Sequence, residues 1–449
     1  MQRFRNLEFY IPLIISVYLI FAFRFKMFVM PFSYSETEFL SENIFNNNGE
    51  LQLFAHKVPN IPALLYYLIF SIFDTNITAI RIAASVFAII LIFVVFKFVN
   101  FFFGKQAGIF AATIMIVQNI FLAQFATVQP EIINTILMLS AFYCFLREKY
   151  RTMCIWLILA VNINISGILA IFFLLISFLI KKNTPNKSQS LVFFLIPIVT
   201  SATAEAVNFM VFDQLSVLKH FTLNNFAENV VDNLNFAFVM QQRLALSLIM
   251  IIALIAAIVQ RQIEGYEVKT YIYAAVFMTL IIMAETLAQS QQCALLVSVT
   301  LLSIITGALL SSINIFYAYK YIIISILIIF FAVFAARNHN TSCEYISHTN
   351  QTETDIKAIN YINETVSAND SIMCSSIYYK MLSNKYLGYI SEKISNIDTS
   401  YCPTQYRYLI KGKDLPSSTI SATLLDDNCM LEKSFTKKDA ETEIFSIEK

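Results

Sequence analysis

The residues of this chain best suited to chemistry are carboxylates and cations near the start of the sequence. Glu36 and Glu38 lie two positions apart in Ser35-Glu36-Thr37-Glu38-Phe39, shortly after a long apolar run. A carboxylate at a water–membrane boundary can act as a general base that takes a proton from an acceptor hydroxyl. The same residues also fit a solvated helix start, with Ser35 as N-cap and Glu38 as its acidic partner. The local pattern by itself favours the helix start.

Cations follow the acidic pair at two places. His56 and Lys57 lead into Val58-Pro59-Asn60-Ile61-Pro62, where the prolines stiffen the approach to an apolar helix. Lys57 can bind a phosphate, or it can snorkel from a loop to the membrane surface. Arg81 lies inside an apolar run, where an arginine is costly unless it is paired, so it is a functional candidate by default. Its planar guanidinium suits a phosphate.

Three further acids lie in or beside apolar runs. Glu131 follows Pro130 at the start of one run, where it can line a site or simply favour the positive end of a helix dipole. Glu205 and Glu285 fall inside apolar runs, where an acid usually pairs or lines a polar cavity. The sequence leaves the roles of Glu205 and Glu285 open.

Several kinds of chemistry are disfavoured by the motifs that the sequence lacks. It has no Walker loop, no strand followed by GxGxxG, no HExxH and no GxSxG, and it has only four His. ATP-driven transport and nucleotide-dependent redox chemistry are therefore disfavoured. A net charge of +1 argues against nucleic acid as a partner. We expect no cofactor; a divalent metal bridged by Glu36, Glu38 and His56 is the alternative.

The elements that must position these residues are membrane-spanning helices. The chain is 57% hydrophobic and 14% charged, whereas soluble domains carry about 25% charged residues. Crossing a hydrocarbon core of about 30 Å takes about 20 apolar residues in a helix. Nine runs of this kind lie near 9–24, 77–99, 108–127, 131–147, 191–212, 244–260, 270–289, 293–318 and 321–337. Residues 153–180 are interrupted by polar residues and predict two short spans that turn at Asn164–Gly167, giving eleven spans in all.

The basic residues predict an orientation for these spans. With the N-terminus in the cytoplasm, thirteen basic residues lie on the cytoplasmic side and six on the outer side, the tail excluded. An odd number of spans then places the C-terminal tail outside. The outer loop between the first two spans, residues 27–76, contains a predicted amphipathic helix from Glu36 to Asn46 and an interfacial helix from Ile61 to Phe73, which is too short to cross.

The tail from Asn338 to Lys449 is a separate polar domain. It carries 15 of the 30 acids and 11 of the 31 Lys and Arg residues. Residues 353–366 have the spacing of an amphipathic helix, and β-like runs follow at Ser371–Ile377, Tyr406–Ile410, Cys429–Phe435 and Glu443–Ile447. We predict a small α/β or α+β domain on the outer side. Its four cysteines suggest one or two disulfides, with open pairing: Cys343, Cys374, Cys402 and Cys429.

The order of these parts resembles a known family. The chain begins with an N-terminal span and an acidic outer loop, followed by a Lys-x-Pro approach at Lys57 and Pro59. Arg81 then lies in the second span and Pro130-Glu131 at the start of the fourth, and a broken helical pair comes next. This resembles the GT-C glycosyltransferases, specifically the protein-mannosyltransferase and aminoarabinose-transferase-like group, glycosyltransferase family 39. In that group the outer loop opens with Asp-Glu, and the Asp is the catalytic base. Here Ser35 stands at the position of the Asp, and Glu36 matches the second acid.

The resemblance implies a mainly α, polytopic enzyme of the bacterial inner membrane, with residues 1–337 as the GT-C-like membrane domain and 338–449 as the extracytoplasmic domain. It implies inverting transfer of a sugar from a polyprenyl-phosphate donor to a hydroxyl of an unknown glycan, lipid or protein acceptor. Glu36 is the first candidate for the base and Glu38 the alternate. The substrate-binding candidates are His56, Lys57, Arg81 and Glu131. The alternatives are a transporter or flippase of lipid-linked sugar and, because of Ser35, an inactive GT-C-like scaffold.

Overall fold

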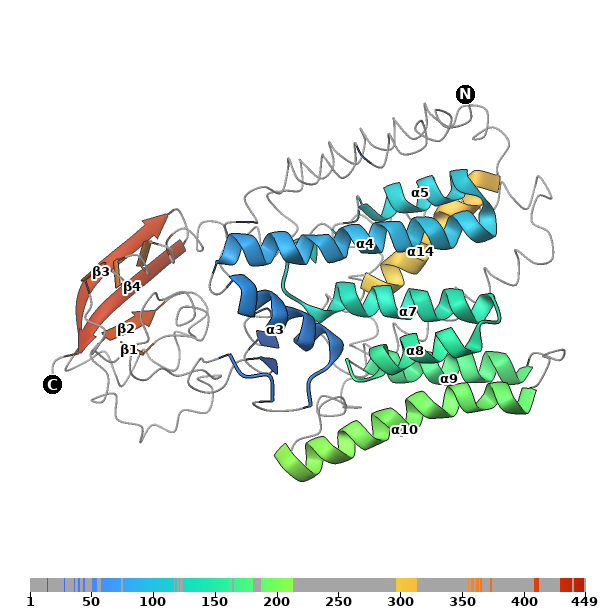
Figure 1. Ribbon diagram of the computed structural model, residues 1–449. Coiled ribbons are helices and arrows are strands. Elements are labelled where there is room, and N and C mark those ends of the chain that lie inside the picture. The colour runs from blue at the N-terminus through green and yellow to red at the C-terminus, as the bar shows by residue number, and fades with distance from the viewer. Residues whose placement is uncertain are drawn as a thin grey trace, which may run out of the picture.

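A computed structural model describes most of residues 51–212 and 296–312, scattered positions between 14 and 44, part of 354–373, and strands between Tyr408 and Ile447. Its helices run side by side in a bundle (Figure 1). They are α3 (Ile61–Phe73), α4 (Ile77–Phe103), α5 (Lys105–Ile116), α7 (Pro130–Leu146), α8 (Tyr150–Val161), α9 (Ile165–Ile180), α10 (Lys187–Phe212) and α14 (Leu296–Ser312). The spans predicted at 244–260, 270–289 and 321–337 lie outside the described residues, as does nearly all of 9–24.

The predicted interfacial helix and the second predicted span are both confirmed as helices. α3 covers the predicted residues and ends shortly before α4 begins. Asn76 caps α4, because its side chain accepts a hydrogen bond from the backbone N–H of Ala79. At the far end, Gly104 has a φ of 88°, a conformation that suits glycine and that lets the chain turn directly into α5.

The predicted break in residues 153–180 is also confirmed. α8 ends at Val161 and α9 begins at Ile165, so the turn starts at Asn162, two residues before the predicted position. The two short helices pack together (Figure 1). Gly167 permits this, because a Cβ atom there would lie 2.7 Å from the carbonyl oxygen of Ala160.

One predicted span is wrong in its length. We predicted a span over residues 108–127, but the helix α5 ends at Ile116. The residues after it, up to Gln129, include buried polar side chains at Gln118, Gln124 and Thr127. The Gln118 side chain donates to the carbonyl oxygen of Ile114 and so satisfies a backbone group at the helix end. The apolar run is therefore not one continuous helix, and the residues directly before α7 become part of the candidate site.

Two of the described helices are long and apolar enough to cross a membrane, Thr78–Phe103 and Ser190–Phe212. Their exposed side chains support this reading. The exposed large apolar residues of α4 include Ile82, Val86, Ile90 and Phe93, which form one apolar stripe at helical spacing. An apolar stripe of this size facing away from the protein interior fits contact with lipid.

Close backbone contact joins α14 to the earlier helices. α14 crosses α5 and packs extensively against it (Figure 1). At the crossing, a Cβ atom on Gly307 would lie 2.4 Å from the backbone nitrogen of Ala111. Only a glycine fits there, and small residues at such crossings are typical of helices that pack within membranes.

The C-terminal region contains the four predicted strands. They are β1 (Ile372–Met373), β2 (Tyr408–Lys411), β3 (Cys429–Lys437) and β4 (Ala440–Ile447), in the order β1-β2-β4-β3. β1 pairs with β2 in parallel, and the other two pairs are antiparallel. Described residues between Thr354 and Thr365 are helical, and Ile362 is buried as the periodicity predicts. The predicted disulfides lie outside what the structure describes.

Candidate functional site

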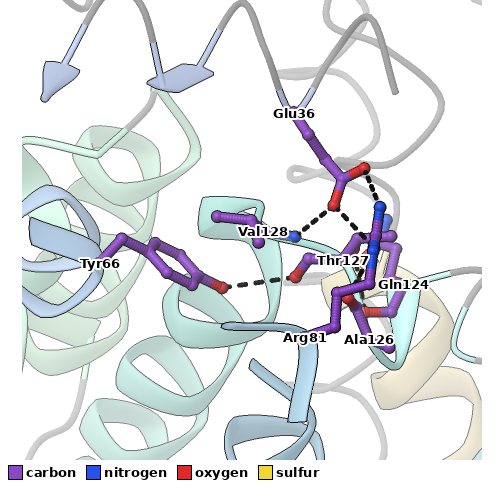
Figure 2. A network of polar contacts seen from close by, with 7 residues as sticks. All are labelled: Glu36, Tyr66, Arg81, Gln124, Ala126, Thr127 and Val128. Carbon is purple, nitrogen blue, oxygen red and sulfur yellow. Dashed lines mark hydrogen bonds and ion pairs between the residues drawn. The ribbon is translucent and has the colours of Figure 1, made fainter. Parts of the chain in front are cut away.

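Glu36 and Arg81 form a buried ion pair at one end of the helix bundle. The guanidinium Nη1 and Nη2 atoms of Arg81 each donate to one carboxylate oxygen of Glu36 at 3.0 Å. Both side chains have 0% exposure. Figure 2 shows the pair with its neighbours. A bidentate pair of this geometry forms strong, directional hydrogen bonds.

Backbone groups of the segment before α7 complete this pair. The N–H of Val128 donates to Glu36 Oε1 at 2.7 Å, and Arg81 Nη1 donates to the carbonyl oxygen of Ala126 at 2.8 Å (Figure 2). Arg81 reaches them because it lies on the inner face of α4, in helical register with the buried residues Ala84 and Ala88. The network thus joins three segments that are distant in sequence.

Tyr66 on α3 holds the same segment from the other side. Its hydroxyl lies 3.4 Å from the carbonyl oxygen of Thr127 and 3.3 Å from that of Gln129, and donates toward both. Figure 2 shows the Tyr66 side chain pointing at Thr127, close to Val128 and the Glu36–Arg81 pair. Burial raises the pKa of Tyr66 well above its usual range, and the charges of Glu36 and Glu131 raise it further. The neutral phenol is the form that can donate a hydrogen bond to these carbonyl oxygens.

Glu131 lies beside this network at the start of α7. It follows Pro130 in the first turn of the helix, where a carboxylate is stabilised by the helix dipole. Its side chain is half-buried, and its charge acts on the Tyr66 hydroxyl. The fold therefore gathers Glu36, Arg81 and Glu131 around one tyrosine.

The approach to α3 is anchored by Asn208 of α10 and by the α8–α9 turn. The backbone N–H of Val58 donates to Oδ1 of Asn208, a buried residue of α10, at 2.7 Å. Asn60 caps α3 by accepting from the N–H of Ala63, and its amide donates to the carbonyl oxygen of Asn162 in the α8–α9 turn at 3.5 Å. The chain directly after Lys57 is thereby fixed against α10 and the α8–α9 turn.

Of the six predicted site residues, three are placed and lie together: Glu36, Arg81 and Glu131. Arg81, predicted to bind phosphate, contacts Glu36 and Ala126 in this structure. Glu38, His56 and Lys57 lie outside the described residues. So does Glu285, whereas Glu205 is half-buried on α10.

Sequence reasoning missed Tyr66, Asn208 and the backbone groups of Ala126 and Val128. Tyr66 carried a usable signal, because Ala63, Tyr66 and Phe70 share one face of the predicted helix at helical spacing. Asn208 carried a weaker one, as a polar residue in an apolar run. The backbone groups carried none, since any residue type supplies them.

One stretch of the sequence matches a known protein family. Residues 57–205 match the sequence profile of the family described as dolichyl-phosphate-mannose-protein mannosyltransferase. The matched stretch contains α3, Arg81, the segment before α7 and Glu131. No curated protein matches the sequence.

Solved structures match over nearly the whole chain. ArnT from Cupriavidus metallidurans bound to undecaprenyl phosphate matches with a TM-score of 0.62 at 10% identity, over 97% of both chains. The apo form of the same protein matches equally well, with a TM-score of 0.62 at 9% identity over 97% of both chains. The chain has the GT-C fold. The oligosaccharyltransferase of Archaeoglobus fulgidus, tethered to an acceptor peptide, shares it with a TM-score of 0.51 at 12% identity, over 92% of this chain and 70% of that one.

The GT-C fold and the profile match confirm the resemblance to the protein-mannosyltransferase and ArnT-like group. Proteins with this fold are polytopic in the membrane, and the apolar stripe on α4 agrees with a membrane location. The helix count of eleven, the orientation of the termini and the outer location of the tail stay predictions.

Proposed function

We propose that this chain is a membrane glycosyltransferase that moves a sugar from a polyprenyl-phosphate-linked donor to an acceptor hydroxyl on the outer face of the membrane. The observation that carries the proposal is the gathering of Glu36, Arg81 and Glu131 at one end of a GT-C bundle. A structure of ArnT with the same fold is bound to undecaprenyl phosphate, a lipid of the proposed donor class. The family profile, which names a lipid-linked mannose, covers Arg81 and Glu131 of this site and begins after Glu36.

The proposed reaction needs one base and one cationic site. The base takes the proton of the acceptor hydroxyl while its oxygen attacks the anomeric carbon of the sugar. The bond from that carbon to the phosphate oxygen breaks, and the polyprenyl phosphate leaves with the electron pair. Cations beside the phosphate stabilise the charge that develops on it. Attack opposite to the leaving group inverts the anomeric centre.

The contacts of Glu36 and Arg81 suggest how these roles are divided. Both Glu36 oxygens bind Arg81, one also accepts from Val128, and the side chain is fully buried. This leaves little room for an acceptor hydroxyl, so we favour Glu38 as the base and Glu36 as the residue that holds the acidic segment in place. The phosphate would be bound by Lys57 with His56, on the stretch anchored by Asn208. Glu131 would line the sugar site.

The test is transfer from lipid-linked sugars in membranes that contain Glu36→Gln, Glu38→Gln or both substitutions. We expect Glu38→Gln to lower kcat by about 100-fold or more, the usual range for loss of a general base. Glu42→Gln, which removes a carboxylate four residues later, is the matched control and should retain transfer. If the double variant transfers sugar at the wild-type rate, the base is neither glutamate.

Two further outcomes decide the class of protein. Binding of lipid-linked sugar by the wild-type chain without turnover on any acceptor would indicate an inactive scaffold, as Ser35 suggests. Lipid flipping in liposomes without transfer would indicate a flippase. We also expect transfer to survive chelation by EDTA; loss of activity that Mn²⁺ or Mg²⁺ restores would favour the alternative metal site at Glu36, Glu38 and His56.

A further inference from the structure

Tyr66 contacts three segments of the candidate site: the one with Phe39, α4 and the residues directly before α7. It is 1% exposed, and it lies on the inner face of α3. Its single hydroxyl hydrogen is shared between the carbonyl oxygens of Thr127 and Gln129, directly before α7. A buried phenol is costly unless its hydroxyl is bonded, so these two carbonyl contacts account for a polar atom in an apolar core.

The ring of Tyr66 contacts the two segments that carry the ion pair. It packs edge-on against Phe39 at 5.8 Å between ring centroids and 77° between ring planes. It packs in the same way against Phe87 of α4, at 5.9 Å and 81°. Phe39 directly follows Glu38 in the sequence, and both Phe39 and Glu36 have helical backbone. The ring therefore contacts the segment with Glu36 and Phe39, and the hydroxyl contacts the segment that leads to Glu131.

The Tyr66 hydroxyl ties the start of α7 to α3. Gln129 is the N-cap residue of α7, and its carbonyl oxygen lies 3.3 Å from the Tyr66 hydroxyl. A phenylalanine at position 66 would keep the ring packing and lose only the hydroxyl contacts with Thr127 and Gln129.

We infer that Tyr66 is a positioning residue, which sets the segment with Glu36 and Phe39 against the start of α7 with Glu131. This inference rests on the proposed function, because it assigns Tyr66 a part in the same transfer reaction. Tyr66 does not contact the reacting atoms. It acts through the segments that present the base and the sugar-binding carboxylate.

The experiment compares Tyr66→Phe with Tyr67→Phe in the purified full-length protein. Both variants lose one hydroxyl from α3, but Tyr67 is only half-buried on a different side of the helix. For Tyr66→Phe we expect kcat to fall about tenfold with the donor KM unchanged. A tenfold change corresponds to about 1.4 kcal/mol, within the net contribution of one hydrogen bond. Tyr67→Phe should match the wild type.

Hydrogen–deuterium exchange provides a second readout that does not require activity. In Tyr66→Phe, backbone amides between residues 124 and 131 should exchange about tenfold faster, while those of α4 and α10 stay unchanged. Unchanged exchange in this segment overturns the inference, whether or not the wild type transfers sugar. Faster exchange with wild-type kcat also overturns it, because Tyr66 is then only structural. A wild-type chain without transfer counts against the proposed function and leaves exchange to decide the positioning role.

Discussion

The buried pair of Glu36 and Arg81 makes a strong prediction about stability. Arg81 donates two charge-assisted hydrogen bonds of 3.0 Å to a carboxylate that has no exposure to solvent. Hydrogen bonds to charged groups contribute about 1.5–3 kcal/mol each, so two of them amount to about 3–6 kcal/mol. Substitution of one partner leaves the other charge buried and uncompensated, and such changes cost about 3–5 kcal/mol. We expect Arg81→Met to lower the free energy of unfolding by this amount, and Glu36→Leu to do the same.

The double variant distinguishes a buried pair from two independent contributions. Glu36→Leu with Arg81→Met removes both charges and replaces them with apolar side chains of similar size, a change that is often neutral for stability. We therefore expect the double variant to regain most of the lost stability, with a coupling energy of at least about 2 kcal/mol. Transfer activity should not return with it, because the acidic segment has lost its anchor to α4.

The assay is equilibrium unfolding in mixed micelles, with sugar transfer measured on the same preparations. Arg151→Met is the control, since Arg151 is exposed and exposed substitutions usually change stability by less than about 0.5 kcal/mol. The buried-pair reasoning is refuted if the free energy of unfolding of each single variant lies within about 1 kcal/mol of the wild-type value, because loss of a buried partner costs at least about that much. Additive losses in the double variant would also refute it.

Two other predictions test the fold around the site. Gly307→Ala should lower the free energy of unfolding by about 1–3 kcal/mol, because the new Cβ atom meets the backbone of Ala111 and forces α5 and α14 apart. Ser312→Ala at the end of α14 is the control. A Gly307→Ala variant with unchanged stability would contradict the close crossing. Asn208→Ala should raise the donor KM about tenfold with kcat unchanged, because Val58 loses its acceptor and the stretch after Lys57 loses its anchor. Thr203→Ala is the matched control on α10, because among the described residues the Thr203 hydroxyl bonds to Val199 of its own helix. An equal effect of Thr203→Ala would remove the special role of Asn208.

Local patterns in the sequence predicted most of the described elements. The interfacial helix at Ile61–Phe73, the long helix that begins near Ile77 and the strands of the C-terminal region all follow from local hydrophobic spacing. The break between α8 and α9 was equally local, because polar residues and Gly167 interrupt an apolar run. The run over 108–127 was misread, because hydropathy does not report where a helix ends when the following segment is also buried.

The partners within the candidate site could not be predicted from local sequence patterns. The sequence determined by itself that Glu36, Arg81 and Glu131 are unusual, since charges are scarce in the first three quarters of the chain and costly inside apolar runs. Only the tertiary structure decided that Arg81 binds Glu36, 45 positions away, and that Val128 and Tyr66 complete the network. The physical reason is that a buried charge takes whichever opposite charge and backbone groups the packing of helices brings within about 3 Å, and hydrophobic periodicity carries no information about that choice.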